Sequence, residues 1–375
     1  MSQPPKMSRR REILLVALSL ILMTLVAETG IRTFDAIRGY GFFSDVRNPL
    51  ARDIKPVRPF KTFGFDLYNT VEGVAYVSSR HGELYPLDKP GGTYRIVVFG
   101  GSTTVNGHAF GEAGIHYPLV MQTRLREALP QKSIEVINVG YAAYCTAHSL
   151  VQLELDVMSW HPDLVILSHN VNDLTAAYWP GLTFDYSNKY SDEVFSVPDL
   201  RDIYTRPNVI FEHSQLYWFI KNRIEILKGN SGTEIRRESL GNAPPPLAVE
   251  IFKRNLQTFI NVARAAGAKV VLGSQPLEPS EEYFLRHMAV KAYNSRITYP
   301  LHEEFVQHHR AFNQAMSDVA AEQGVLFLDN DASFAGDRQL FYDYVHYSPE
   351  GVRKLADNFA TFLLDAGLHG LTRER

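Results

Sequence analysis

The sequence predicts an α/β protein built on a five-stranded parallel sheet, and two observations lead to this prediction. From Tyr94 onwards, short runs rich in β-branched residues alternate with longer helix-like stretches, as strands and helices do around a parallel sheet. The chain has 375 residues, of which 45% are hydrophobic, so it can bury the core of one enlarged domain. We therefore expect a doubly wound sheet with helices on both faces, preceded by an N-terminal transmembrane helix.

The predicted strands are short, apolar and bounded by turn residues. They cover residues 95–99, 134–138, 164–168, 269–273 and 325–328. Helices are predicted at about 112–129, 147–159, 247–266, 306–323 and 349–367. The last helix has the clearest start, because Ser348 can cap it, Pro349 suits the first turn and Glu350 complements the helix dipole.

The N-terminus carries a basic flank followed by an apolar run. Lys6 and three arginines precede residues 13–27, which contain only two polar residues. Continued to Arg32, the run reaches the roughly 20 residues that a bilayer requires, so we predict a signal anchor over residues 13–32. A cleaved signal peptide is one alternative, although the small-x-small cleavage pattern is poor at the end of the run. A buried core helix is another, although a terminal run that is apolar on all sides is unusual for one.

The positions of the basic residues also predict topology and domain organisation. Positive residues before the anchor place a tail at 1–12 in the cytoplasm and the rest of this single-pass protein in the periplasm or outside the cell. Residues 33–90 show no sustained period and are interpreted as a connector with a small accessory element. The main domain is predicted over residues 91–370, with insertions at 174–246 and 276–301.

Composition excludes several classes of partner. The formal net charge is −3, whereas nucleic-acid binding requires a clustered basic surface. The single cysteine, Cys145, excludes an intramolecular disulfide and a metal cluster made of several cysteines. Phosphate-loop, dinucleotide-binding and zinc-protease motifs do not fit the sequence. We therefore predict no nucleic-acid partner, no cofactor and no metal.

Polar residues and glycines follow three of the predicted strands and recur beyond the last. These are Gly100–Thr104 after the first strand, Gly140 and Tyr141 after the second, His169–Asp173 after the third, and Asp343 and His346 beyond the fifth. In open parallel sheets, ligands bind at the carboxyl ends of the strands. We therefore expect these residues to meet at one edge of the sheet.

Together these residues supply the parts of an acyl-transfer site. A serine hydroxyl is a weak nucleophile until a positioned base accepts its proton and an acid fixes the tautomer of that base. The spacing of Asp343 and His346 allows the carboxylate to reach Nδ1 while Nε2 faces Ser102. A tetrahedral intermediate also needs hydrogen-bond donors for its oxyanion. The candidates are the backbone N–H groups of Ser102 and Gly140 and the side-chain amide of Asn172.

These four blocks resemble the SGNH hydrolase superfamily, also called GDSL esterases and lipases, over about residues 94–367. The G-D-S motif corresponds to residues 100–102, the block-two glycine to Gly140, G-x-N-D to residues 170–173 and D-x-x-H to residues 343–346. Two positions depart from the family pattern, because Gly101 replaces the aspartate and Asn170 replaces a glycine. The first departure leaves the nucleophile intact, and the second alters the floor of the pocket.

The resemblance implies a flavodoxin-like three-layer fold and a serine hydrolase that acts on carboxylic esters through an acyl-enzyme. We expect it to remove small acyl groups, such as acetyl, from a carbohydrate or another envelope substrate. Thr103, Tyr141, His169 and Asn170 are the candidate substrate-binding residues. Two alternatives are an O-acyltransferase acting on a polysaccharide, which requires a pocket that excludes water, and a noncatalytic binding protein on the same scaffold.

Each candidate residue also has a purely structural interpretation. Ser102 could cap a helix, Asn172 could be a turn residue, and Asp343 and His346 could be an ordinary surface pair. The aromatic residues of the insertion at 174–246 could line a pocket mouth or form a small core of their own. Four such coincidences at strand ends are improbable, so the functional interpretation is favoured.

Overall fold

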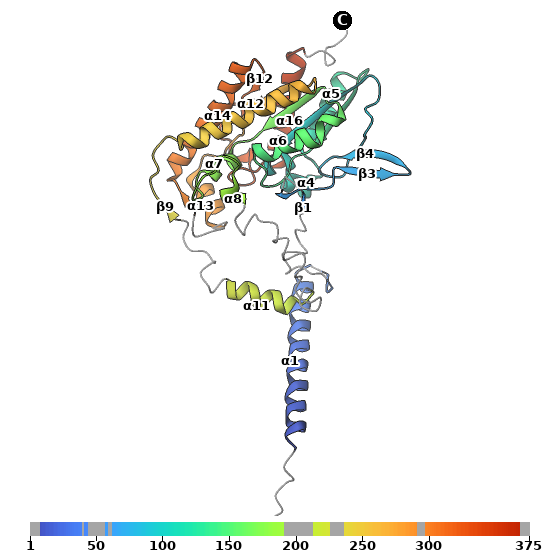
Figure 1. The fold of residues 1–375 in the computed structure, drawn as a ribbon, viewed down its shortest axis with the longest axis vertical. Coiled ribbons are helices and arrows are strands. Elements are labelled where there is room, and N and C mark those ends of the chain that lie inside the picture. The colour runs from blue at the N-terminus through green and yellow to red at the C-terminus, as the bar shows by residue number, and fades with distance from the viewer. Residues whose placement is uncertain are drawn as a thin grey trace, which may run out of the picture. The chain divides into compact units, whose positions relative to one another are not determined.

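The computed structural model describes residues 8–39, 41–43, 57–58, 62–190, 213–225, 236–290 and 297–367. The chain forms two compact units (Figure 1). The smaller unit comprises Met1–Lys55 and Val197–Thr233, and the larger comprises Pro56–Ser196 and Glu234–Arg375. Part of the predicted insertion at 174–246 therefore groups with the N-terminal helix, while the rest belongs to the larger unit.

The larger unit contains a five-stranded parallel sheet. Its strands are β6 (Thr93–Gly100), β7 (Ser133–Asn138), β8 (Leu164–Ser168), β10 (Lys269–Gly273) and β12 (Leu326–Leu328). They lie in the order β12-β10-β8-β6-β7, and every pairing is parallel. The chain thus turns back between β6 and β8, which is where doubly wound sheets bind their ligands. The predicted fold class is confirmed, and all five strands lie within two residues of their predicted bounds.

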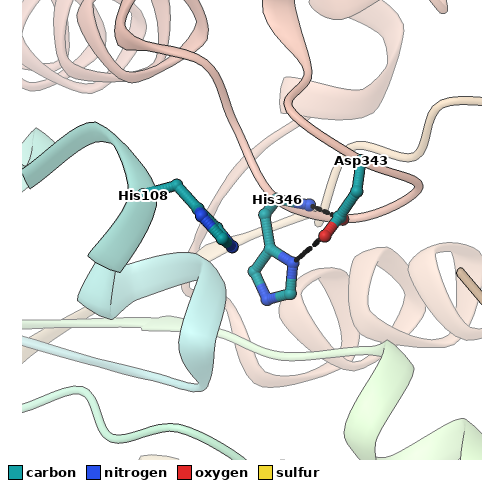
Figure 2. A group of neighbouring side chains, drawn as sticks. All are labelled: His108, Asp343 and His346. Carbon is teal, nitrogen blue, oxygen red and sulfur yellow. Dashed lines mark hydrogen bonds and ion pairs between the residues drawn. The ribbon is translucent and has the colours of Figure 1, made fainter. Parts of the chain in front are cut away.

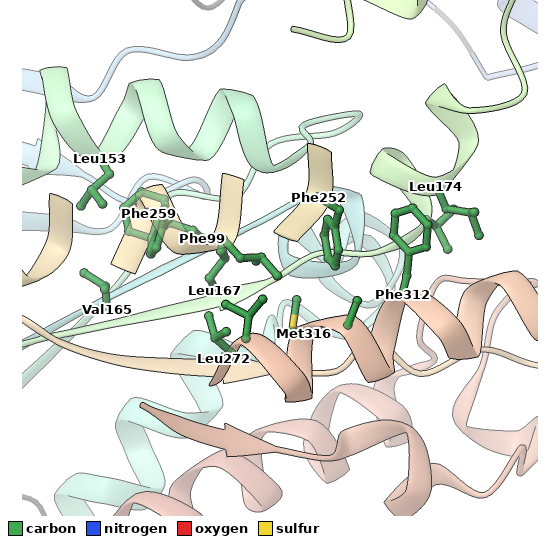
Figure 3. Close-up of a cluster of buried hydrophobic side chains, with 14 of the residues drawn as sticks. Phe99, Leu153, Val165, Leu167, Leu174, Phe252, Phe259, Leu272, Phe312 and Met316 are labelled. Atoms are coloured by element: carbon green, nitrogen blue, oxygen red, sulfur yellow. The ribbon is translucent and has the colours of Figure 1, made fainter. Parts of the chain in front are cut away.

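Alternate residues of the sheet pack against helices on its two faces, because successive side chains of a strand point in opposite directions. Val97 and Phe99 of β6 belong to one buried cluster, while Ile96 and Val98 belong to another. The first cluster is covered by α6 (Thr146–Leu155), α12 (Pro246–Ala265) and α14 (His302–Gln323), and part of it appears in Figure 3. The second is covered by α5 (Tyr117–Ala128) and α16 (Pro349–Asp365).

Local signals explain where two of these helices begin. The Ser348 hydroxyl accepts a hydrogen bond from the Gly351 N–H at 3.2 Å, so α16 starts as predicted. The helix predicted at 112–129 instead begins only at Tyr117. A separate helix, α4 (Gly107–Ala113), ends at Gly114, whose φ of +66° is a left-handed conformation that terminates helices.

A small antiparallel sheet precedes the main one, within the predicted accessory element. It consists of β3 (Tyr68–Val71), β4 (Val74–Ser78) and β5 (Leu84–Pro86). The Asn138 carbonyl at the end of β7 accepts from the Arg80 N–H at 2.7 Å, which links the two sheets. Two shorter pairs are β1 (Val57–Arg58) with β2 (Thr62–Phe63), and β9 (Arg236–Arg237) with β11 (Thr298–Tyr299).

The smaller unit contains the helices α1 (Arg9–Ile37) and α11 (Gln215–Glu225), which contact each other. With 29 residues, α1 is about 44 Å long at 1.5 Å per residue, and among the described residues it is the one helix long and apolar enough to cross a membrane. Its apolar side chains are exposed, for example Ile13 at 64% and Leu25 at 59%. The buried-core alternative is therefore wrong, and α1 is a candidate membrane span or signal sequence.

Candidate functional site

Ser102, His346 and Asp343 form a continuous hydrogen-bonded chain. His346 Nε2 lies 2.8 Å from Ser102 Oγ. On the other side of the ring, His346 Nδ1 lies 2.8 Å from Asp343 Oδ2 and 2.9 Å from Oδ1, as Figure 2 shows for the pair. The sequence motifs predicted that these three residues would meet, and the structure places them within hydrogen-bond distance.

A tight turn at the end of β6 presents the serine. Helix α3 (Ser102–Val105) begins directly after this turn, with Gly101 in the capping position. Ser102 is thus the first helical residue and its hydroxyl is bonded to His346, so the capping interpretation of Ser102 is wrong. Gly100 is required at the turn, because a Cβ there would collide with Thr104 Oγ1.

The loop that carries Asp343 and His346 is held by its own backbone. Asp343 Oδ1 accepts hydrogen bonds from the N–H groups of Val345 at 3.0 Å and His346 at 2.9 Å. Between them, Tyr344 is fully buried and packs edge-on against Phe284 at 5.3 Å. The Asp343 and His346 side chains are 23% and 15% exposed, so they are a partly enclosed pair and not an ordinary surface pair.

Asn172 lies against the turn that presents the serine. It is in α7 (Val171–Ala176), directly after β8, and its Nδ2 donates to the Tyr144 carbonyl at 2.8 Å. A Cβ placed on Gly101 would lie 2.6 Å from Asn172 Nδ2. The amide therefore occupies the space in which the family's aspartate side chain would begin. A side-chain amide has two N–H donors, so the bond to Tyr144 uses only one of them.

The N–H of Gly140 was predicted to donate to the oxyanion, but in the structure it is bonded within the protein. Its N–H donates to Asn138 Oδ1 at 2.9 Å, and Asn138 Nδ2 in turn donates to the Thr104 carbonyl at 2.9 Å. The Gly140 N–H therefore already has an acceptor within the protein. Sequence reasoning missed Asn138, although its position at the end of β7 is one of the strand ends at which polar residues were expected.

The four candidate substrate-binding residues are buried. Their exposed fractions are 6% for Thr103, 7% for Tyr141, 2% for His169 and 1% for Asn170. Asn170 Nδ2 donates within the protein to Asn313 Oδ1 at 2.7 Å. His169 Nε2 lies 2.8 Å from Ser149 Oγ, and burial lowers the pKa of His169 to about 3. These contacts indicate that Asn170 and His169 support the site from inside.

His108 lies near a predicted strand end, was expected to line the pocket or to be structural, and is a neighbour of the site. This exposed residue of α4 stacks on the Tyr342 ring with centroids 3.8 Å apart, and its ring lies 5.6 Å from that of His346 (Figure 2). The possible metal-binding atoms of His108, Asp343 and His346 lie within 4.8 Å of one another. Both ring nitrogens of His346 already have hydrogen-bond partners, so this group fits proton transfer better than metal binding.

Such a chain of groups can activate an alcohol for attack on a carbonyl. An imidazole that is held by a carboxylate and bonded to a hydroxyl can accept the hydroxyl proton as the oxygen attacks. The site lies at the carboxyl ends of the strands, next to β6 and β8, where doubly wound sheets bind their ligands. An arrangement of this kind can cleave an ester bond by acyl transfer to the hydroxyl.

The chain belongs to the GDSL-like lipase/acylhydrolase family, whose sequence model matches residues 98–354. It is therefore an ester-hydrolysing enzyme, a carboxylesterase or acylhydrolase. A comparison with curated protein sequences found no match.

Several solved structures are similar to this chain. An acetylxylan esterase from Geobacillus stearothermophilus has 17% identity and a TM-score of 0.41, covering 75% of this chain and 95% of the esterase. An α/β hydrolase from the metagenome of Lake Arreo, Spain, has 15% identity and a TM-score of 0.41, with 75% and 97% coverage. A GDSL-like lipase from Bacteroides thetaiotaomicron has 12% identity and a TM-score of 0.38, with 72% and 88% coverage. The family assignment rests on the sequence match alone.

Proposed function

We propose that this enzyme hydrolyses carboxylic esters with Ser102 as nucleophile, His346 as base and Asp343 as the acid that orients it. The observation that carries the proposal is the unbroken hydrogen-bonded chain from Ser102 Oγ through His346 to the Asp343 carboxylate. Ser102 Oγ attacks the carbonyl carbon while His346 Nε2 takes its proton. His346 then protonates the leaving alcohol, and water, activated by the same imidazole, releases the acid and restores Ser102.

The oxyanion of each tetrahedral intermediate is bound by the backbone N–H of Ser102 and the side-chain amide of Asn172. The amide lies against the backbone that precedes the nucleophile, and its bond to the Tyr144 carbonyl fixes its orientation. Preorganised donors of this kind contribute the largest electrostatic term in many acyl transfers. Gly140 completes the hole as a third donor only when its N–H turns away from Asn138.

Partial exposure of the site supports hydrolysis over acyl transfer. The side chains of Asp343 and His346 are 23% and 15% exposed, and a transferase must exclude water from its acyl-enzyme. Tyr342, 54% exposed, lies directly beside Asp343 in the chain. One face of its ring stacks on His108, and the other face can pack against the apolar face of a sugar. These features support an O-acylated carbohydrate as substrate. The arginines at the N-terminal end of α1 support a catalytic domain outside the cytoplasm.

The nucleophile assignment is tested with Ser102→Ala in the full chain, solubilised in detergent. We expect this variant to lose hydrolysis of p-nitrophenyl acetate and labelling by a fluorophosphonate, because only an activated serine reacts quickly with that reagent. Ser159→Ala is the matched control, since Ser159 is exposed and its hydroxyl donates to the carbonyl of Asp156, which lies far along the sequence from the three site residues. Wild-type activity in Ser102→Ala, with folding unchanged, would refute the assignment.

A further inference from the structure

A lysine is buried behind the proposed oxyanion hole. Lys189 belongs to the short helix α8 (Ser187–Tyr190) in the predicted insertion, and only 3% of it is exposed. Lysine is almost never fully buried without partners. Its ammonium donates to the Asn172 carbonyl at 2.8 Å and to Thr175 Oγ1 at 2.8 Å. Both acceptors lie in α7, the helix that presents the Asn172 amide.

The carboxylate of Asp173, which like Asn172 lies in α7, attracts the charge of Lys189. Asp173 is fully buried and accepts hydrogen bonds from the Thr146 N–H, at 3.1 and 3.2 Å to its two oxygens, and from the Thr146 hydroxyl. Burial lowers the pKa of Lys189 to about 8, against the attraction of the Asp173 carboxylate. The ammonium is therefore largely protonated at neutral pH, and a charged donor makes a stronger hydrogen bond than a neutral one.

The next residue, Tyr190, holds the turn that carries the acceptor of the Asn172 side chain. Its hydroxyl donates to the Ala143 carbonyl at 2.6 Å. Ala143 has a φ of +65°, a left-handed conformation that is unfavourable for an alanine and needs support from its surroundings. The carbonyl of the following residue, Tyr144, accepts from Asn172 Nδ2 at 2.8 Å. Lys189 thus holds the main chain of Asn172, and Tyr190 holds the turn that orients its amide.

We propose that Lys189 and Tyr190 are positioning residues that fix the Asn172 amide for stabilisation of the oxyanion, an inference that rests on the proposed role of Asn172. Oxyanion donors act only within about 2.7–3.1 Å of the developing charge, and a misplacement of about 1 Å can cost on the order of a hundredfold in rate. The insertion after the third block of motif residues therefore helps to orient a catalytic group in addition to any role in enclosing a pocket.

The test compares Lys189→Met and Tyr190→Phe in the wild-type and Asn172→Ala backgrounds, using the full chain in detergent. In the wild-type background, we expect each change to lower kcat for p-nitrophenyl acetate about ten- to a hundredfold, as the loss of a charged or buried hydrogen bond would. The KM should change little, because the amide acts on the transition state. In the Asn172→Ala background, neither change should lower kcat further, because residues that act through one group are not additive.

Lys253→Met is the matched control, because Lys253 is a partly exposed lysine that pairs with Asp318. It should leave kcat unchanged. Tyr190→Phe removes one hydroxyl and keeps the ring, so it tests the proposal even if Lys189→Met does not fold. Equal losses of kcat in both backgrounds, or unchanged kcat in a folded Tyr190→Phe, would overturn the proposal. An unchanged kcat in Asn172→Ala itself would instead overturn the oxyanion assignment, so the two failures are distinguishable.

Discussion

Replacing Gly101 by alanine should damage catalysis through the Asn172 amide. Gly101 has φ −89° and ψ −152°, an extended backbone outside the left-handed region that favours glycine. An added Cβ, however, would lie 2.6 Å from Asn172 Nδ2 and 3.1 Å from the Tyr144 carbonyl oxygen. Ordinary contacts begin at 3.4 Å, so the amide must retreat by about 0.8 Å, which is enough to move it out of the narrow range in which an oxyanion donor acts.

The expected loss equals that of one oxyanion donor. Such a loss lowers kcat by about 10² to 10³, or about 2.7 to 4 kcal/mol of transition-state stabilisation, with KM little changed. The same loss is expected for Asn172→Ala, which removes the donor directly. Because the methyl group of Gly101→Ala has nothing to displace once the amide is gone, Gly101→Ala should have no further effect on kcat in the Asn172→Ala background.

The measurement is steady-state hydrolysis of p-nitrophenyl acetate by wild type, the two single variants and the double variant. Melting temperatures are measured on the same samples. Gly111→Ala is the control, since a Cβ on this α4 residue meets nothing within 4 Å. A Gly101→Ala variant with wild-type kcat would refute the reasoning. So would a folded double variant much slower than Asn172→Ala.

Three further outcomes are expected. His346→Ala should lower kcat about as severely as Ser102→Ala, and the double variant should be no worse, because the members of a triad act as a unit; much greater loss in the double variant would contradict this. A reporter fused after residue 375 should be active only outside the cytoplasm, and an alkaline carbonate wash should leave the chain in the membrane if α1 is an uncleaved anchor; a cytoplasmic signal or release of the chain would contradict these two expectations. Burial lowers the pKa of His169 to about 3, so its contribution to stability is complete above the ordinary value of about 6.5 and is lost as the pH falls towards 3, at about 1.4 kcal/mol per pH unit. Urea unfolding of wild type and His169→Gln at about pH 7 and about pH 5 should therefore show that the free energy of unfolding falls less in the variant as the pH is lowered. Equal decreases in both proteins would rule out this role of His169.

Much of the fold was readable from the sequence because the signals are local. The buried strands are short apolar runs, and their bounds follow from composition alone. The Ser348 cap and Pro349 define the start of α16 within a few residues of chain. The proximity of Ser102, Asp343 and His346 could be predicted because sheet topology places strand ends together, so a motif after β6 and one beyond β12 meet at the same edge.

The remaining features depend on where side chains point after folding. Gly140 lies at its predicted strand end, yet its N–H donates to the Asn138 side chain. Asn170 and His169 also lie at a strand end, but they point inward to buried partners. The contact of Lys189 with α7 joins residues 17 positions apart, and no periodicity predicts it, because a lysine in a sequence is usually interpreted as a surface residue.

The distance along the chain between Ser102 and His346 bears on when activity can first arise. Ser102 follows the first strand of the sheet, whereas His346 follows the last, 244 residues later. A ribosome releases the serine long before the histidine, and domains generally fold as units during synthesis. With the roles proposed for Ser102 and His346, a chain still being made carries the nucleophile without its base. We therefore expect no ester cleavage before His346 has been added, and none from a truncated product that ends before His346.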